Sequence, residues 1–106
     1  MKALELIRKE RERQISKEGY DADHDGHHIR GELSEAAAAY AKCTSAMLRG
    51  ADADEFPADM MVDAGDWPFE ESAWKLTDDP IRNLVKAGAL IVAELDRLIA
   101  EREEYL

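Results

Sequence analysis

The segment DPIRNLVKAGALIVAELDRL, residues 79–98, decides the fold. Asp79 before Pro80 is a good N-cap and first-turn pair, so it predicts the start of a helix. Apolar residues then recur at spacings of four and three, a stripe suited to antiparallel packing against another helix. Its members are Ile81, Val85, Gly88, Val92, Leu95 and Ile99. Gly88 costs roughly 1 kcal/mol of helix propensity relative to alanine, and it predicts a place where a second helix comes close.

The helix that begins at Pro80 should run over residues 80–104. The sequence predicts two further helices before it. The first is predicted over residues 2–17, with a stop at Gly19. Its apolar stripe is Leu4, Ile7, Arg11 and Ile15. The second is predicted over residues 28–49, with Gly50 after its end, and its alanine run favours both helix formation and close packing. Its stripe is Leu33, Ala36, Ala37, Tyr40, Thr44, Met47 and Leu48.

The chain therefore predicts an all-α fold: a small bundle of three main helices in a single domain, residues 1–106. A long connection, residues 51–77, joins the second helix to the last and should hold a short helix over residues 58–64. It contains DWPFEESAWK, residues 66–75. The aromatic side chains of this block, Trp67 and Trp74 among them, have two interpretations. They seal the open side of the bundle, or they form a wall on which a nucleobase stacks.

The apolar pattern of the last helix also predicts that the protein forms an oligomer. Leu84, Leu90, Ile91 and Leu98 flank its main stripe, so its apolar surface is wider than one neighbouring helix can cover. Pairing with a second copy would bury the remainder. We therefore expect a homo-oligomer, with the last helix in the contact.

Composition narrows the functional classes. The formal net charge is -10 and the isoelectric point is about 4.7, so the surface should repel the phosphate backbone of nucleic acids. Free nucleotides remain candidate ligands if a metal ion bridges them. The single cysteine, Cys43, fits a reducing compartment. With no signal-peptide pattern and no apolar run of membrane-spanning length, the sequence predicts a cytoplasmic protein without a membrane partner.

One polar stretch matches a calcium loop. Residues 21–32 read DADHDGHHIRGE, which fits the EF-hand pattern D-x-D-x-D-G-x5-E at every fixed position. Three features oppose calcium (Ca2+): His28 stands where an aliphatic residue is usual, Gly19 interrupts the entering helix, and the loop has no partner loop. The favoured expectation is a polar turn leading into the second helix, with calcium binding as an alternative.

A second constellation overlaps this loop. If the helix starts at residue 28, His28, Glu32 and Glu35 fall on one flank beside the apolar stripe. Two carboxylates one turn apart suit a hard cation such as Mg2+ or Mn2+, with His28 and Asp25 as further candidate ligands. The plain alternative is an acidic first turn favoured by the helix dipole.

Four blocks together resemble a family of small uncharacterised phage and prophage proteins. They are RKERERQISKEG (residues 8–19), HDGHHIRGELSEAAAAYA (residues 24–41), and the two segments quoted above at residues 66–75 and 79–98. The family pattern in the middle block is similar to H-D-D-x-H-x-x-G-E. Gly26 stands here where the second Asp is usual, and this departure is what completes the EF-hand glycine.

The layout also resembles phage MazG-like proteins, which are all-α nucleotide pyrophosphohydrolases. The resemblance implies an E-R-x-R-Q block, met here by Glu12 and Arg13 or by Glu10 and Arg11. It also implies an E-x-x-E pair, met by Glu32 and Glu35, that holds magnesium against the phosphates of a nucleoside triphosphate.

The second acidic pair implied by this resemblance would fall near Asn83 and Lys86, and neither is a carboxylate. Glu94 is the candidate replacement for it. Lys86 or Arg82 would meet phosphate.

The expected function is metal-assisted nucleotide binding, with at most weak pyrophosphohydrolase activity in which Glu32, Glu35 and Glu94 would be catalytic. Arg82, Lys86, Trp67 and Trp74 would contact the nucleotide or another small anionic ligand. One rival is a non-catalytic phage accessory protein that binds a host protein or sequesters a nucleotide signal. The other is a calcium-binding helix–loop–helix. Metal-dependent turnover separates the first function from both rivals.

Overall fold

The computed structural model describes residues 1–19 and 30–103 and, within these ranges, contains helices and no strand. The all-α prediction is confirmed. The main helices are α1 (Ala3–Glu18), α3 (Glu32–Met47) and α5 (Pro80–Glu103). The connection holds α4 (Ala58–Asp63) and two 3-10 turns, η1 (Ala53–Glu55) and η2 (Glu71–Ala73).

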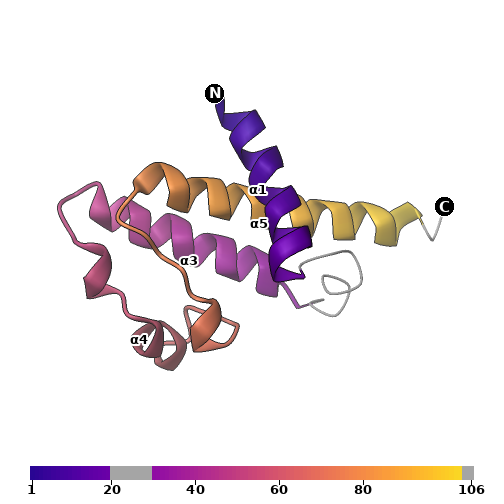
Figure 1. Ribbon diagram of the computed structural model, residues 1–106. Coiled ribbons are helices and arrows are strands. Elements are labelled where there is room, and N and C mark those ends of the chain that lie inside the picture. Colours follow the sequence, from indigo (N-terminus) through magenta and orange to yellow (C-terminus); the bar gives the residue numbers. More distant parts are fainter. Residues whose placement is uncertain (20–29, 104–106) are drawn as a thin grey trace.

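The helices α3 and α5 lie side by side, and α1 crosses α5 (Figure 1). The crossing is at Gly88, which contacts the side chain of Ile7, so the predicted close approach is confirmed. Gly19 ends α1 in a left-handed conformation, and Asp79 Oδ1 accepts a hydrogen bond from the backbone N–H of Ile81 in the first turn of α5. Both predicted helix boundaries are thus correct.

The start of α3 differs from the prediction. Gly31 is the N-cap with φ of 85°, a left-handed conformation that an α-helix cannot continue through. The helix therefore begins at Glu32, and the continuous helix predicted from residue 28 is wrong at its start. The candidate ligands Asp25 and His28, and residues 21–29 of the predicted calcium loop (residues 21–32), lie outside the described residues.

The apolar stripes predicted for α1 and α3 are also partly wrong. In α1, Leu4 and Ile15 are exposed, while Glu10 and Gln14 are buried. The apolar spacing in α1 is too sparse to dictate a face, and the ion pairs described below decide which side is turned inward. In α3 the stripe is buried from Leu33 to Thr44, but Leu48, beyond the end of the helix, is 68% exposed.

The helix α5 buries a different face from the one that the spacing predicts. Ile81, Leu95 and Ile99 are exposed, although Val85 is buried. The face that the structure buries combines small, apolar and polar side chains. Its members are Asn83, Lys86, Ala87, Ala89, Leu90, Ala93 and Glu94. The alanines let α3 approach closely, and this contact outweighs the larger aliphatic stripe on the other side.

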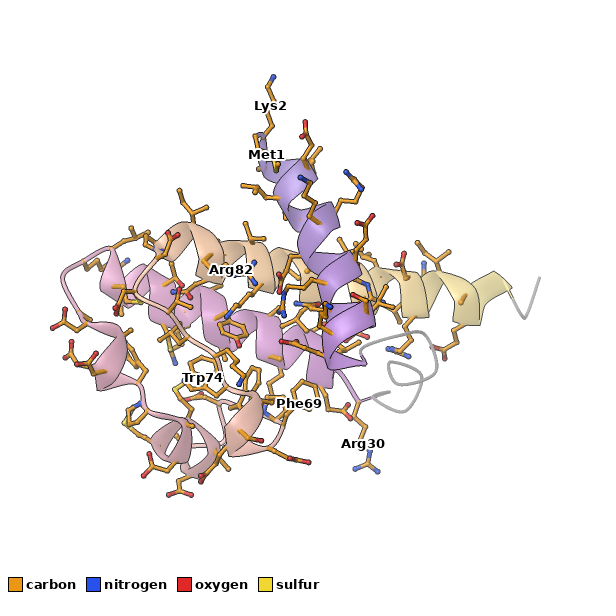
Figure 2. All side chains as sticks on the ribbon, in the orientation of Figure 1. Met1, Lys2, Arg30, Phe69, Trp74 and Arg82 are labelled. Carbon is orange, nitrogen blue, oxygen red and sulfur yellow. The ribbon has the colours of Figure 1, made fainter. Side chains whose placement is uncertain are left out.

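The connection closes the open side of the bundle with aromatic rings (Figure 2). Tyr40 of α3 stacks on Trp74 with centroids 4.7 Å apart and meets Trp67 edge-on at 5.4 Å. Each indole N–H donates to a backbone carbonyl, Trp67 to Glu70 and Trp74 to Phe56. Trp67 is almost fully buried, as the sealing interpretation expects. The helices of the described part are too short or too polar to cross a bilayer.

Candidate functional site

A buried carboxylate gathers two arginines where α1 meets α5. Glu10 is 2% exposed. Arg13, one turn later on α1, donates from Nε and Nη2 to its two oxygens, each at 2.8 Å. Arg82 of α5 pairs with Glu10 Oε1 at 2.7 Å, and Gln14 Nε2 donates to Oε2 at 3.3 Å. This cluster joins the two helices by an ion pair between Glu10 of α1 and Arg82 of α5.

The protonation of this cluster follows from its contacts. Burial by itself would raise the pKa of Glu10, but hydrogen bonds from Arg13 and Arg82, with the attraction of both charges, bring that pKa below its ordinary value. The hydrogen bond to Glu10 raises the pKa of Arg13. At neutral pH the cluster therefore carries one negative and two positive charges.

The two guanidinium groups border a surface hollow of about 300 Å³ between α1 and α5. Its apolar lining is Leu6, Ile81 and Val85, and its charged lining is Lys9, Glu10, Arg13, Asp79 and Arg82. The ionised groups sum to +1, three cations against two carboxylates. In a chain of net charge -10, this is a local site of the opposite sign. Both arginine side chains are 37% exposed, so solutes can reach them.

Lys86 lies on the inner side of the same cluster. Its Nζ donates to the carbonyl of Lys75 at 2.5 Å and sits 5.7 Å from the centroid of the Tyr40 ring. Burial, followed by repulsion from Arg82, lowers the pKa of Lys86. The cavity beside it measures only about 10 Å³, room for roughly one water molecule. Lys86 is thus held by the protein itself and does not face the 300 Å³ hollow.

The side chain of Asn83 holds the backbone of Thr77, just before the start of α5. It is fully buried. Its Nδ2 donates to the carbonyl of Thr77 at 2.8 Å, and its Oδ1 accepts from Thr77 N and Oγ1, each at 2.9 Å. One of these bonds requires an amide donor, which a carboxylate lacks. The asparagine at this predicted acidic position therefore has a structural role that an ionised aspartate could not fill.

Glu94 caps α3 from a distance of 60 residues along the chain. Its Oε2 accepts from Ser34 Oγ at 2.9 Å and from Ser34 N at 3.3 Å, and its Oε1 accepts from Arg97 Nε at 2.7 Å. The N-cap, Gly31, has no side chain with which to do this. Burial by itself would raise the pKa of Glu94, but the hydrogen bonds from Arg97 and Ser34 lower it. Both oxygens of this candidate catalytic residue are engaged with protein groups.

The predicted metal pair lies at the same end of α3. Glu32 Oε1 accepts from the backbone N–H of Arg30 at 2.6 Å, and Glu35 is exposed one turn on. Across residues 1–19 and 30–103, no three His, Cys, Asp or Glu side chains lie close enough to hold a metal ion. Two of the four predicted ligands fall outside these ranges, so the Mg2+ or Mn2+ site stays a prediction.

The predicted site residues do not form one cluster. Arg82 and Glu94 are 12 positions apart on α5, which is about 18 Å along the helix axis. The structure joins Lys86 to Tyr40 and the tryptophans, Arg82 to Glu10, and Glu94 to the start of α3. Arg82 and Glu94 therefore do not share one site.

The sequence pointed to this cluster only indirectly. The E-R-x-R-Q block includes Glu10 and Arg13, but the resemblance pairs Glu10 with Arg11 and Arg13 with Glu12. In the structure Glu12 is exposed and pairs with Arg8 at 2.8 Å. The signal in the sequence that does predict the contact between Glu10 and Arg13 is a carboxylate one turn before an arginine, on a helix with few apolar residues.

Comparison with known proteins returned no match to a family model, a curated protein or a solved structure. The resemblance to MazG-like proteins accordingly rests on the sequence blocks alone.

Proposed function

We propose that this protein binds a small phosphate-bearing anion, such as a nucleotide, in the hollow between α1 and α5. The observation that carries the proposal is the convergence of Arg13 and Arg82, from two different helices, at the wall of that hollow. A guanidinium group presents five N–H donors. Among the described residues, Glu10 and Glu18 engage Nε and Nη2 of Arg13, and Glu10 pairs with Nη1 of Arg82, so both arginines keep N–H donors for a ligand. Lys9 at the rim adds a third cation.

The lining of the hollow suits both the charged and the apolar parts of a nucleotide. Phosphate groups would meet the cations, while Leu6, Ile81 and Val85 offer apolar contact to a sugar or base. The predicted nucleotide contacts Trp67 and Trp74 do not line this hollow, and both are packed against Tyr40 instead. Binding rather than catalysis is the favoured activity, because the two predicted acidic positions hold Asn83 and Lys86, each engaged with backbone carbonyls.

A matched pair of lysines tests the location. Lys9 lines the hollow, whereas Lys17 lies two turns later on the same helix and does not. Isothermal titration with inorganic triphosphate and with adenosine triphosphate, each with and without Mg2+ or Mn2+, measures affinity. We expect Lys9→Gln and Arg82→Gln to weaken binding about tenfold, in line with one charge-assisted hydrogen bond, and Lys17→Gln to leave it unchanged.

Three outcomes would contradict the proposal. They are no binding of either probe at millimolar concentration, equal weakening by Lys17→Gln, and brisk metal-dependent release of pyrophosphate. The last would identify an enzyme and would restore the catalytic role predicted for Glu32, Glu35 and Glu94. Loss of binding in Glu32→Gln with Glu35→Gln, but not in Lys9→Gln, would move the site to the start of α3.

A further inference from the structure

The side chain of Gln14 carries a buried oxygen that needs a hydrogen-bond donor. Gln14 is 3% exposed, and its Nε2 donates to Glu10 Oε2 at 3.3 Å. Its Oε1 accepts no hydrogen bond from residues 1–19 or 30–103. Turning the amide over would not help, because Oε1 would then face the Glu10 carboxylate, and both groups are acceptors. Since buried polar groups in folded proteins are almost always hydrogen-bonded, this oxygen calls for a donor from outside the described protein groups.

Lys86 has N–H donors to spare beside the same cavity. An ammonium group has three N–H donors, and within the described part of the chain Lys86 Nζ gives one of them to the carbonyl of Lys75. Gln14 and Lys86 both line the cavity of about 10 Å³ described above, and Glu10 lines it with them. The two side chains do not bond to each other directly, since Gln14 Oε1 has no partner there. An acceptor and a donor, both buried, therefore border one small space.

We propose that a single water molecule is bound in this cavity as a fixed part of the fold, accepting a hydrogen bond from Lys86 Nζ and donating one to Gln14 Oε1. The volume is about that of one water molecule, and a buried water needs two to four polar partners. The Glu10 carboxylate in the same lining offers a third partner. A cation would meet the positive charge of Lys86, and an anion would meet the oxygens of Gln14 and Glu10. A neutral molecule that both donates and accepts suits the lining better than either ion.

The water site would connect three parts of the chain. Gln14 belongs to α1, Lys86 belongs to α5, and the carbonyl of Lys75 belongs to the connection after η2. The bound water would also give the ammonium group of Lys86 one contact that resembles hydration. Burial is the main cause that lowers the pKa of Lys86, so such a contact favours its charged form.

This inference is independent of the proposed function. Glu10 and Arg13 border both spaces, but Gln14 and Lys86 do not line the 300 Å³ hollow. The phosphate-binding titrations and the water measurements below therefore have separate outcomes, and failure of one proposal leaves the other standing.

Oxygen-17 relaxation dispersion of the solvent tests the site in solution, because its amplitude counts water molecules that stay bound for longer than the protein takes to tumble. We expect the amplitude to fall by one water molecule in Gln14→Met and in Lys86→Met. Methionine keeps an unbranched chain and lacks the amide or ammonium group. Glu12→Gln, an exposed change on α1, is the matched control and should keep the parent amplitude. An unchanged amplitude in either methionine variant, or an equal loss in Glu12→Gln, would overturn the proposal.

A high-resolution crystal structure of the parent chain tests the same site without any variant. We expect a water oxygen within roughly 2.6–3.2 Å of both Gln14 Oε1 and Lys86 Nζ. A direct hydrogen bond between these two atoms would overturn the proposal. So would a protein group, from any part of the chain, that donates to Gln14 Oε1 and fills the cavity.

Discussion

Ile7 of α1 lies so close to Gly88 of α5 that a Cβ atom added to Gly88 would come within 2.7 Å of Ile7 Cδ1. The contact fixes where the two helices cross. It also explains a glycine in the middle of a 24-residue helix, where helix propensity alone would favour alanine.

A double-mutant cycle should show a change of sign at this crossing. In the parent chain, Gly88→Ala should lower the free energy of unfolding by about 1 kcal/mol, because overpacking outweighs the gain in helix propensity. In an Ile7→Ala background the same substitution should raise it by about 1 kcal/mol, since the clash is gone. Denaturant unfolding of the four proteins measures both effects. The same sign in both backgrounds would contradict the contact.

The buried ion pairs predict unequal effects for two nearby glutamates. Glu10→Gln should cost roughly 2–3 kcal/mol, because it leaves Arg13 and Arg82 without their charged partner. Both arginines are part-exposed, so water limits the loss. Glu12→Gln, which removes an exposed pair with Arg8, should cost less than about 0.5 kcal/mol. Equal costs in thermal or denaturant unfolding would show that burial of Glu10 has no energetic effect.

The cap that Glu94 supplies predicts a loss of stability in acid. Its pKa in the folded state is below the ordinary value of 4.5, so the folded state binds its proton less readily than the unfolded state does. The stabilisation is therefore complete above about pH 5 and is lost as pH falls through the folded-state pKa. Glu94→Gln should cost about 1–2 kcal/mol at pH 7, and this difference should shrink below pH 4.

Glu101 provides a matched control for Glu94, because both glutamates pair with Arg97. Glu101 also pairs with Arg97 but is 56% exposed, so Glu101→Gln should change stability little at any pH. A difference between Glu94→Gln and the parent chain that stays constant from pH 7 to pH 3 would exclude the proposed cap.

Placing a carboxylate at the position of Asn83 should destabilise the fold. In Asn83→Asp the buried carboxylate would face the carbonyl of Thr77, where the amide now donates, at a cost of about 2–4 kcal/mol at pH 7. The pKa of the new carboxyl group should be raised, so the lost stability should return as pH falls and the group is protonated. Urea unfolding at pH 7 and at pH 4 measures this reversal. A variant as stable as the parent at pH 7 would show that the position tolerates a charge.

Cys43 should react slowly with thiol reagents. It is buried against Met61, and burial, followed by the negative charge of Asp66, raises the pKa of its thiol. We expect reaction at least about 100 times slower in the native protein than in denaturant, because the thiolate forms only on opening. A Cys43→Ala chain with Leu48→Cys provides an exposed thiol for comparison. Equal native rates for the two thiols would place Cys43 at the surface.

Much of the fold could be predicted from local signals. Asp79 and Pro80 set the start of α5, Gly19 set the end of α1, and Gly88 marked the crossing. These features work because capping and close approach are decided within a few residues. The alanine-rich stripe of α3 was recognised for the same reason, since it is dense enough to define a face.

The faces of α1 and α5 could not be predicted in this way. Periodicity assumes that the largest aliphatic residues are buried, whereas α5 turns Leu95 outward and packs its alanines on α3. In α1 the decisive residue is Glu10, and its burial depends on Arg82, which is 72 positions away in the sequence. An ion pair between residues so far apart in the sequence leaves no periodic pattern. The sequence therefore does not predict that Glu10 and Arg82 lie in the same site.

The cap on α3 has a consequence for how the chain folds as it is made. The first turn of α3 is synthesised 60 residues before the carboxylate that caps it. At roughly 5–20 residues per second, Glu94 is added about 3–12 s after Ser34. During that interval the start of α3 has neither its cap nor the alanine face of α5, and Leu33 has no partner from the last helix to cover it. The start of α3 should therefore become fully ordered only after Glu94 and the alanine face of α5 have been added to the chain.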